Sequence, residues 1–597
     1  MSDDFDVCVI GSGAGGAPVA AVAAEAGYRV VVLEKGPWYE RDQFLKDEVE
    51  FCRRPTIWPN RNEEPQVWEQ IDDRGDRSAT KTGHLWNPNV VGGSSIHMSG
   101  FFLRLKPADF HYRSTYGPVE GASVADWPIT YDDLEPWYAL VEQEVGVAGW
   151  VPDLPPHLAE PRSTEDFPFE ATREHPLADH IDVACERMGL HPFAMPRAVL
   201  PEDWTRNASG KPIKRRGCAY AGYCGMYGCR TGAKGSALEA YLPRALATGR
   251  CEIRPRSMVS KLVTDASGKI VRAEYFDAEG ERRTIEASIF VVACQAVESA
   301  RLLLASRGSR HPNGLANSSG LVGRNLLYST FGAGWGEFPY KKQYRTHARN
   351  DPANDWLRSQ ETFLNRALQD WYFIDDPRLG RRKGGTINFL LNHPNPISGA
   401  INQMRNEDRP GTSPVWGRAL KQKLHRYFHD ALHVRWELFV EWIPSTRCRV
   451  TLDQHVTDKW GQPVSRVNHY SHIRNREAAR YMADRAMQVM RRMEAENVRS
   501  VARFGGPSTN LQGGTCRFGE NPQTSVLDRD CRAHDVRNLF VTDASFMPSG
   551  GGVPFTFTIF ANARRVAAQI VEQLGGVRTA GVPSHGDPRQ RTAPGGK

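Results

Sequence analysis

Residues 5–16 read FDVCVIGSGAGG and decide the fold. The apolar run FDVCVI, rich in β-branched residues, predicts a buried parallel strand. After the Gly-rich turn, the Ala-rich stretch APVAAVAAEAG at 17–27 has strong helix propensity, and YRVVVLEKG at 28–36 predicts a second buried strand. Together these pieces have the size of a β-turn-α-β unit, which takes about 30 residues.

The turn itself matches a phosphate-binding pattern. Gly11, Gly13 and Gly16 fit G-x-G-x-x-G, whose glycines allow a tight turn, approach of a pyrophosphate and close helix packing. The helix N-terminus behind them offers unpaired N–H groups to the phosphates. Glu34 ends the second strand, where a carboxylate accepts hydrogen bonds from a ribose diol and disfavours a 2′-phosphate. The unit therefore predicts binding of FAD or NAD rather than NADP.

The composition argues against several classes of protein. With 597 residues, 40% of them hydrophobic, the chain is long enough for a large core and ordinary for a globular protein. A net charge of +7 without a long Lys/Arg block argues against dedicated nucleic-acid binding. The sequence has no apolar run of the roughly 18 residues that predict a membrane span. The acidic start MSDDFDV does not look like a secretory signal, so the sequence by itself predicts a cytoplasmic location.

Further stretches resemble the glucose–methanol–choline (GMC) oxidoreductase family, in order and over almost the whole chain. Besides GSGAGG…VLEKG, they are VVGGSSIHMSG at 90–100, DWPITYDDLEPWY at 126–138, CQAVESARLLLAS at 294–306, NSSGLVGRNL at 317–326 and NLFVTDASFMPSGGGVPFTFTIFANARRVA at 538–567. The resemblance implies FAD as the cofactor. It also implies an α/β fold in which a Rossmann-like FAD-binding domain, assembled from separated segments, carries an α+β substrate domain.

The segments and cofactor contacts follow from the same resemblance. The predicted segments are 1–150 (FAD-binding, with the second Gly-rich loop), 151–250 (loop-rich insertion), 251–330 (FAD-binding), 331–500 (substrate domain), 501–576 (C-terminal FAD and active-site segment) and 577–597 (a disordered tail). The expected FAD contacts beyond the first unit are Gly92 and Gly93 of the second Gly-rich loop, Val259 at the adenine, Asp543 at the pyrophosphate or ribitol, and Thr556 in the C-terminal block.

His97 follows the second Gly-rich loop. Some members of the family carry a histidine at the matching place, and in certain of them it is covalently bonded to the flavin. Others with this histidine bind FAD without a bond. The expectation for this chain is a histidine that packs near the flavin non-covalently.

Most of the eleven cysteines are scattered, which is typical of reduced thiols, but Cys218, Cys224 and Cys229 stand close together. Thiolates suit Fe–S clusters or zinc, and a structural zinc site wants four ligands. The stretch resembles the Cys-rich segment of the gluconate 2-dehydrogenase flavoprotein branch of the family, which often has a further cysteine where this chain has Ala221. Three thiolates predict a 3Fe–4S cluster. The alternative is a set of unliganded thiols in a structural turn.

The catalytic positions depart from the family pattern. By the resemblance, the family's histidine base falls on Asn510, or on Leu511 if the gap is placed differently, and its second polar residue, His or Asn, falls on Pro554. An amide orients a substrate oxygen but is not a useful base, so the base stays unknown. His469, His472 and His534 are nearby in sequence, although each is more often a core or surface histidine. Two accounts need no such base: an acidic substrate, or a flavoprotein without ordinary alcohol chemistry.

The resemblance implies an FAD-dependent oxidoreductase acting on CH–OH donors. The first reading is a dehydrogenase that oxidises a sugar, glycoside or related alcohol by hydride transfer to flavin N5, with an Fe–S cluster passing electrons to a cytochrome or quinone-linked acceptor. The alternatives are a metal-free oxidase using O₂ and a non-catalytic flavin-binding subunit. Relatives of the gluconate branch work with a small subunit and a c-type cytochrome. Export with a signal-bearing small subunit would place this chain in the periplasm.

Overall fold

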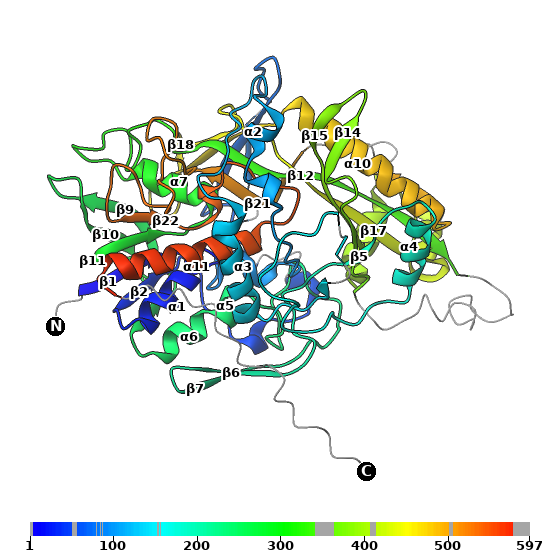
Figure 1. Cartoon of the computed structure of the whole chain (residues 1–597), viewed down its shortest axis with the longest axis horizontal. Helices are drawn as coiled ribbons and strands as arrows, with labels where there is room; N and C mark the ends of the chain where they lie inside the picture. Colours follow the sequence, from blue (N-terminus) through cyan, green and yellow to red (C-terminus); the bar gives the residue numbers. More distant parts are fainter. Residues whose placement is uncertain are drawn as a thin grey trace, which may run out of the picture.

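The computed structural model describes residues 4–576, except 51–55, 79, 84, 86, 152–153, 156, 341–362, 406–412 and 501–505, and except the side chains of 506–508 and 510. The tail predicted at 577–597 lies outside the described residues. Two β-sheets organise the described chain (Figure 1).

The first sheet is built around the N-terminal unit and has the order β8–β2–β1–β11–β10–β9, with β22 paired to β11. Its strands are β1 (Asp4–Ile10), β2 (Val30–Leu33), β8 (Cys251–Arg254), β9 (Met258–Thr264), β10 (Ile270–Phe276), β11 (Arg282–Val292) and β22 (Leu539–Val541). β1 pairs in parallel with β2 and β11, and Val7, Val30 and Ile289 lie side by side in the core. Continuous apolar runs suit strands that are buried on both faces. The expected Rossmann-like domain is confirmed.

The second sheet is larger and has the order β4–β3–β19–β18–β12–β17–β16–β13–β5, with β20 and β21 also paired to β12. Its strands are β3 (Gln66–Ile71), β4 (Lys81–Gly83), β5 (Phe193–Ala194), β12 (Arg324–Pro339), β13 (Arg366–Leu368), β16 (Gly385–Leu391), β17 (Ala431–Val440), β18 (Arg449–Thr457), β19 (Pro463–Tyr470), β20 (Glu496–Ser500) and β21 (Gly506–Thr515). Trp436 and Leu438 alternate along β17 and pack with Met482 and Ala486 of α10 (Ile473–Arg492).

Helices and two hairpins complete the architecture. The remaining helices are α1 (Ala17–Glu25), α2 (Tyr112–Tyr116), α3 (Tyr131–Val145), α4 (Leu177–Glu186), α5 (Ala237–Ala240), α6 (Leu242–Ala247), α7 (Ala296–Ala305), α8 (Pro396–Met404), α9 (Gly417–His425) and α11 (Thr556–Gln573). The short helical turns are η1 (Arg41–Gln43), η3 (Gly93–His97), η4 (Pro107–Asp109), η8 (Arg426–Asp430) and η9 (Ala544–Phe546). The hairpins are β6 (Trp204–Ala208) with β7 (Lys211–Arg215), and β14 (Phe373–Asp376) with β15 (Gly380–Lys383). Thr130 caps the start of α3, since its Oγ1 accepts a hydrogen bond from the Asp133 N–H at 3.2 Å.

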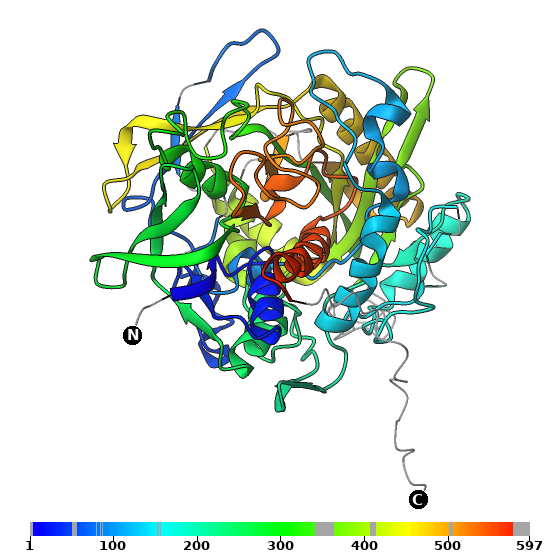
Figure 2. The same cartoon turned by 60° about the vertical axis from the view of Figure 1, so that its left-hand side comes forward.

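The C-terminal segment joins the two sheets. β21 belongs to the second sheet, β22 to the first, and α11 packs against α1 and α3. Figure 2 shows these orange and red residues in the middle of the molecule, between the blue N-terminal unit and the green and yellow strands. β3, β4 and β5 come from the first two predicted segments but pair in the second sheet. The site is therefore formed where several distant stretches of chain meet.

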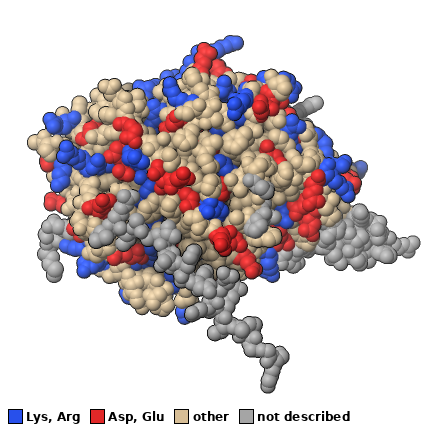
Figure 3. All heavy atoms as spheres, viewed as in Figure 1, with Lys and Arg blue, Asp and Glu red and all other residues tan. Residues whose placement is uncertain are grey.

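The face of the molecule drawn in Figure 3 shows no charge pattern that would indicate a partner. On the face drawn in Figure 3, the Lys and Arg side chains of the described residues are interspersed with Asp and Glu. None of the helices in the described part of the chain is both long enough and apolar enough to cross a membrane.

Candidate functional site

The first Gly-rich turn leaves no room for side chains. Gly11 has a φ of +98°, and a Cβ there would overlap the carbonyl oxygen of Ala293, while a Cβ on Gly16 would overlap the oxygen of Gly11. α1 begins directly after Gly16. Its first N–H groups and positive dipole end are therefore placed to bind phosphate.

The second Gly-rich loop closes against the first. A Cβ on Gly93, whose φ is +56°, would lie 2.9 Å from the Cα of Gly13. The N–H of Gly92 donates a hydrogen bond to Ser12 Oγ at 2.8 Å. Only glycines allow the two backbones to come this close, so the pair of loops forms one cradle.

A cavity opens from this cradle. Of the residues predicted to bind the cofactor, those that line it are Gly11, Gly13, Glu34, Gly93, Val259, Asp543 and Thr556. Gly16, Gly92 and His97 belong to the same two loops but are not in its lining. Seven of the ten predicted residues thus line one cavity, and they come from the two loops, β9, α11, the end of β2 and the start of η9.

Glu34 and Asp543 organise the walls of the cavity. Glu34 accepts hydrogen bonds from the Ser12 N–H at 3.0 Å and the Gly36 N–H at 2.8 Å, and burial raises the pKa of its carboxyl despite these bonds. Asp543 accepts from the Gln295 and Ser545 N–H groups and from the hydroxyls of Ser299 and Ser545, and burial likewise raises its pKa. Their hydrogen bonds to ribose and to pyrophosphate or ribitol stay predictions.

Two lining residues escaped the sequence analysis. Gln512 donates from Nε2 to Asn87 Oδ1 at 3.0 Å and to the Leu85 carbonyl. Gln512 Oε1 and Asn87 Nδ2 are buried without a hydrogen-bond partner among the described residues. One acceptor and one donor therefore remain for a bound polar group. In the sequence, the only sign that Gln512 belongs to the site is its position directly before Gly-Gly-Thr. Nothing in the sequence marked Asn87 as a site residue.

His97 is buried, and its ring lies edge-on to Trp58 with the centroids 5.0 Å apart. Burial and then Lys234 lower the pKa of His97 to about 3, so the imidazole is neutral. Its Nε2 has no hydrogen-bond partner among the described residues. A neutral ring with a free nitrogen suits a hydrogen bond to a cofactor and leaves a covalent bond open to test.

None of the three histidines named from the sequence lines the cavity, and each has structural contacts. His469 is buried beside Trp68, its Nδ1 is 2.8 Å from the Tyr328 hydroxyl, and burial lowers its pKa to about 4. His472 Nδ1 accepts from the Arg474 N–H at the start of α10. His534 Nε2 lies 2.9 Å from Ser525 Oγ.

The two family catalytic positions lie on neighbouring pieces of the C-terminal segment. Asn510 is part of β21, and its side chain is outside the described part, whereas the next residue, Leu511, lines the cavity. Pro554 is buried in the turn before α11, between Gly552 and the cavity residue Phe555. Their catalytic roles stay predictions.

A buried cluster of charged side chains fixes the turn before α11. Lys383 Nζ forms ion pairs with Asp109 and, at 2.6 Å, with Glu441, and all three side chains are at most 2% exposed. Glu441 accepts hydrogen bonds from the N–H groups of residues 550 and 551. Tyr372 donates to Asp109 at 2.6 Å and accepts from the N–H of residue 552 at 3.0 Å. The turn before α11 is therefore fixed by ionic and hydrogen-bond contacts.

The predicted cysteine cluster lies beside the second Gly-rich loop. Cys218, Cys224 and Cys229 pack around one small core with Tyr220 and Phe363. The Met226 N–H donates a hydrogen bond to the His97 carbonyl at 2.9 Å. The Cys-rich loop and the cofactor loop thus share a backbone contact.

Lys234 strengthens this junction. Its buried ammonium donates to three carbonyl oxygens: Ile96 at 2.9 Å, Cys224 at 2.7 Å and Tyr227 at 2.8 Å. Burial alone would raise the pKa of the Cys229 thiol, but Lys234 and hydrogen bonds at the sulfur bring it below its ordinary value. The Lys234 ammonium therefore lies between the second Gly-rich loop and the thiols of the Cys-rich loop.

A Gly-rich turn joins a parallel strand to a helix and faces a cavity that a second Gly-rich loop closes. This arrangement defines a Rossmann-type dinucleotide-binding protein. Two family models, both described as GMC oxidoreductase, match residues 75–330 and 444–563. The chain belongs to the GMC oxidoreductase family, and the resemblance stated from the sequence is confirmed.

Curated relatives extend over nearly the full length. The chain is 30% identical to 2-methyl-1,2-propanediol dehydrogenase of Mycolicibacterium austroafricanum, over 96% of this chain and 97% of that protein. It is 29% identical to 6'''-hydroxyparomomycin C oxidase of Streptomyces lividus (97% and 93% covered) and 24% identical to the gluconate 2-dehydrogenase flavoprotein of Pantoea cypripedii (95% and 94% covered). The chain is therefore an oxidoreductase acting on CH–OH donors.

The fold is shared with solved structures of the family. Pyridoxine 4-oxidase from Mesorbium loti superposes with a TM-score of 0.58 at 16% identity, over 95% of this chain and 99% of that one. The residues present fit FAD. The glycine cradle and α1 offer a phosphate site, and Asn87 Nδ2 and Gln512 Oε1, which have no partner among the described residues, offer a donor and an acceptor. Family and fold support FAD as the cofactor.

Acid denaturation of the purified holoprotein is expected to release its FAD. The neutral His97 ring is held by burial and by Trp58, and nothing in these contacts requires a bond to the flavin. The measurement is the flavin absorbance of the supernatant after precipitation in acid. Flavin that stays with the precipitate in the parent but not in His97→Ala would show a covalent bond instead.

Proposed function

We propose that the chain is a dehydrogenase that oxidises a C–OH group of a sugar, glycoside or related alcohol and passes the electrons through an Fe–S cluster on Cys218, Cys224 and Cys229. The names of the relatives support an alcohol donor, since they describe a diol, an aminoglycoside and gluconate. Bound FAD would supply the hydride acceptor, flavin N5. The residues of this chain hold that cofactor, orient the alcohol and position the outgoing electron carrier.

The observation that carries the proposal is the junction between the cofactor loop and the Cys-rich loop. Met226 hydrogen-bonds to the His97 carbonyl, and Lys234 bridges the carbonyls of Ile96 and Cys224. Loops fixed to each other in this way keep a cofactor and a cluster at a constant, short separation. The positive charge of Lys234 also offsets the negative charge that thiolate ligands bring.

The spacing of the thiols favours a cluster over a single metal ion. A zinc–sulfur bond is about 2.3 Å, so two thiolates on one zinc lie at most about 4.6 Å apart. Among the described residues, these three sulfurs do not form a set within 4.8 Å of one another. A cluster of several irons spans a wider set of ligands, and three thiolates match the ligand count of a 3Fe–4S cluster.

A cytochrome or quinone-linked protein would receive the electrons. We propose a small subunit and a c-type cytochrome as partners, as the gluconate branch of the family suggests. The location would then be periplasmic if the small subunit carries the export signal, and cytoplasmic otherwise. Co-purification of the chain expressed with its genomic neighbours, followed by haem staining, tests this part.

Cys224→Ser is expected to remove most of the iron, about three atoms per flavin, from anaerobically purified protein. Reduction of the flavin by substrate should survive, because the substituted thiol does not line the cofactor cavity. Transfer to an external acceptor should slow. Cys251→Ser, at a thiol on β8 outside the Cys-rich loop, is the control and should keep its iron.

The same measurement distinguishes the proposed dehydrogenase from an oxidase. An oxidase relative at 29% identity favours that second candidate. Protein that is free of iron, retains full turnover and reduces O₂ to hydrogen peroxide would make the chain an oxidase and its cysteines structural. A flavin that no alcohol in a sugar and polyol panel reduces would instead indicate a non-catalytic subunit.

Asn510→Ala is expected to cost about 1–3 kcal/mol of transition-state binding in kcat/KM, because the proposed hydrogen bond to the reacting oxygen is lost. The pH profile of kcat/KM should keep its shape, since an amide does not titrate. Asn510→Asp should slow flavin reduction by adding a negative charge near the reduced flavin. Unchanged kinetics in Asn510→Ala would show that other residues form the site.

A further inference from the structure

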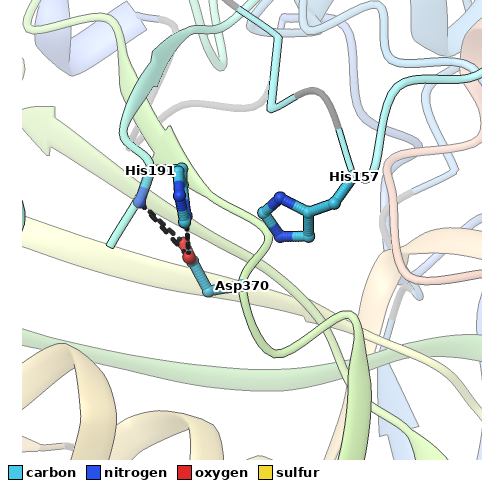
Figure 4. Close-up of side chains that lie close together, drawn as sticks. All are labelled: His157, His191 and Asp370. Atoms are coloured by element: carbon cyan, nitrogen blue, oxygen red, sulfur yellow. Dashed lines mark hydrogen bonds and ion pairs between the residues drawn. The ribbon is translucent and has the colours of Figure 1, made fainter. Parts of the chain in front are cut away.

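Two histidines and an aspartate from three separate stretches of chain meet on the surface. His157 lies in the loop after α3, His191 between α4 and β5, and Asp370 between β13 and β14. One possible ligand atom from each residue lies within 4.8 Å of the other two. Figure 4 shows the ring of His157 directed from its own loop toward His191 and Asp370.

Two of the three residues are already held in place by the protein. The Asp370 carboxylate accepts hydrogen bonds from the His191 backbone N–H at 3.2 and 3.3 Å, and its Oδ1 lies 2.7 Å from the ring Nδ1 (Figure 4). Asp370 is little exposed, with 9% of its side chain accessible. A carboxylate fixed in this way loses little freedom when it binds a metal.

His157 is the member that the protein contacts alone do not explain. Its ring centroid is 4.7 Å from that of His191 at an angle of 67°, and no hydrogen bond or ion pair joins it to a described residue. Two imidazole rings beside a carboxylate offer two nitrogen ligands and one oxygen ligand to a metal.

We propose that His157, His191 and Asp370 form a binding site for a first-row transition-metal dication, tested here as Zn²⁺. Imidazole and carboxylate ligands suit zinc, nickel and copper, whereas magnesium and calcium take oxygen ligands. Three protein ligands leave a coordination position for water. Because both histidines are exposed, the metal exchanges with solution. The site is chemically distinct from the thiols of the Cys-rich loop.

A metal here would join three separate stretches of the fold. β5, which follows His191, is a two-residue strand at the edge of the second sheet, and it pairs with β13, which precedes Asp370. The loop that carries His157 would be tied to that edge. Binding to the folded chain alone raises the unfolding temperature as the free metal concentration increases.

The experiment compares Zn²⁺ binding by tag-free wild type, His157→Ala, His191→Ala and Asp370→Asn, using equilibrium dialysis with metal analysis and thermal unfolding. Each variant is expected to bind one Zn²⁺ fewer per chain at micromolar metal and to lose the metal-dependent rise in unfolding temperature. His425→Ala with His429→Ala is the matched control, because this second exposed pair lies beside Asp430 but is not a described three-ligand set. The control should behave as wild type.

Cobalt and the cofactor readouts distinguish this site from the proposed function. Co²⁺ bound here should give visible bands of a nitrogen–oxygen site that are lost in His157→Ala and kept in Cys224→Ser. FAD content, iron content and turnover should be unchanged in all three variants. Equal Zn²⁺ stoichiometry and equal thermal shifts in His157→Ala and wild type would overturn the proposal and leave an ordinary His–Asp ion pair.

Discussion

Gly11→Ala is expected to yield protein without FAD. A Cβ at this position would overlap the Ala293 carbonyl at the end of β11, and the φ of +98° disfavours any L side chain. Relief of the overlap must move either β11 or the turn that presents α1 to the phosphates. Both movements break the cradle, so the absorbance of bound flavin should be lost and KM for added FAD should rise at least a hundredfold.

Gly27→Ala is the matched control for this substitution. Gly27 has nearly the same φ, +97°, but nothing lies within 4 Å of a Cβ built there. The control therefore carries the backbone strain without the overlap, and it should lose about 1 kcal/mol of unfolding free energy while keeping a full complement of FAD. Equal flavin content in Gly11→Ala and Gly27→Ala would mean that this turn does not hold the cofactor.

Lys383→Met should lower the free energy of unfolding by about 3–5 kcal/mol, the usual cost of removing one partner of a buried ion pair. The substitution leaves Asp109 and Glu441 buried without their cation. Burial alone would lower the pKa of Lys383, but these carboxylates raise it above its ordinary value. Their contribution to stability is therefore present below the pKa of an unfolded lysine, about 10.4, and is lost at higher pH.

The same change should loosen the turn that the cluster holds. Glu441 accepts hydrogen bonds from residues 550 and 551, directly before Pro554 and α11. Urea unfolding measures the stability, and flavin fluorescence during the titration shows whether FAD leaves before the global transition. Lys459→Met is the control, because that lysine is 43% exposed and its surface ion pair contributes at most about 1 kcal/mol. A loss in Lys383→Met no larger than in the control would contradict this role; Asp109→Asn tests it if the first variant does not fold.

The cofactor half of the protein was predictable because its signals are local. The strand, turn and helix of residues 4–25 are encoded by neighbouring residues: apolar β-branched runs, glycines at positions that allow no Cβ, and an Ala-rich helix. The second Gly-rich loop and the C-terminal block were identified by resemblance. The cavity confirms that most of these stretches converge, although what each residue contacts in FAD stays a prediction.

The substrate half was less visible in the sequence. Residues 335–470 supply β13, β16, β17, β18, β19 and the end of β12 in the second sheet. The side chains of these strands alternate between a face that packs on α10 and a face turned away from it. Because the strands that pair come from distant positions in the sequence, a short window of sequence does not reveal the sheet. No histidine near the expected catalytic positions proved to line the cavity, which leaves the base unassigned.

The sequence by itself determined the dinucleotide turn, the family and the group of three cysteines, because each depends on residues a few positions apart. Only the tertiary structure decided which distant charges meet: Lys383 with Asp109 and Glu441, and His157 with His191 and Asp370. Most of these residues lie in loops or at the ends of elements, and each comes from a different part of the sequence. Their contacts therefore exist only once the fold has brought those distant parts together.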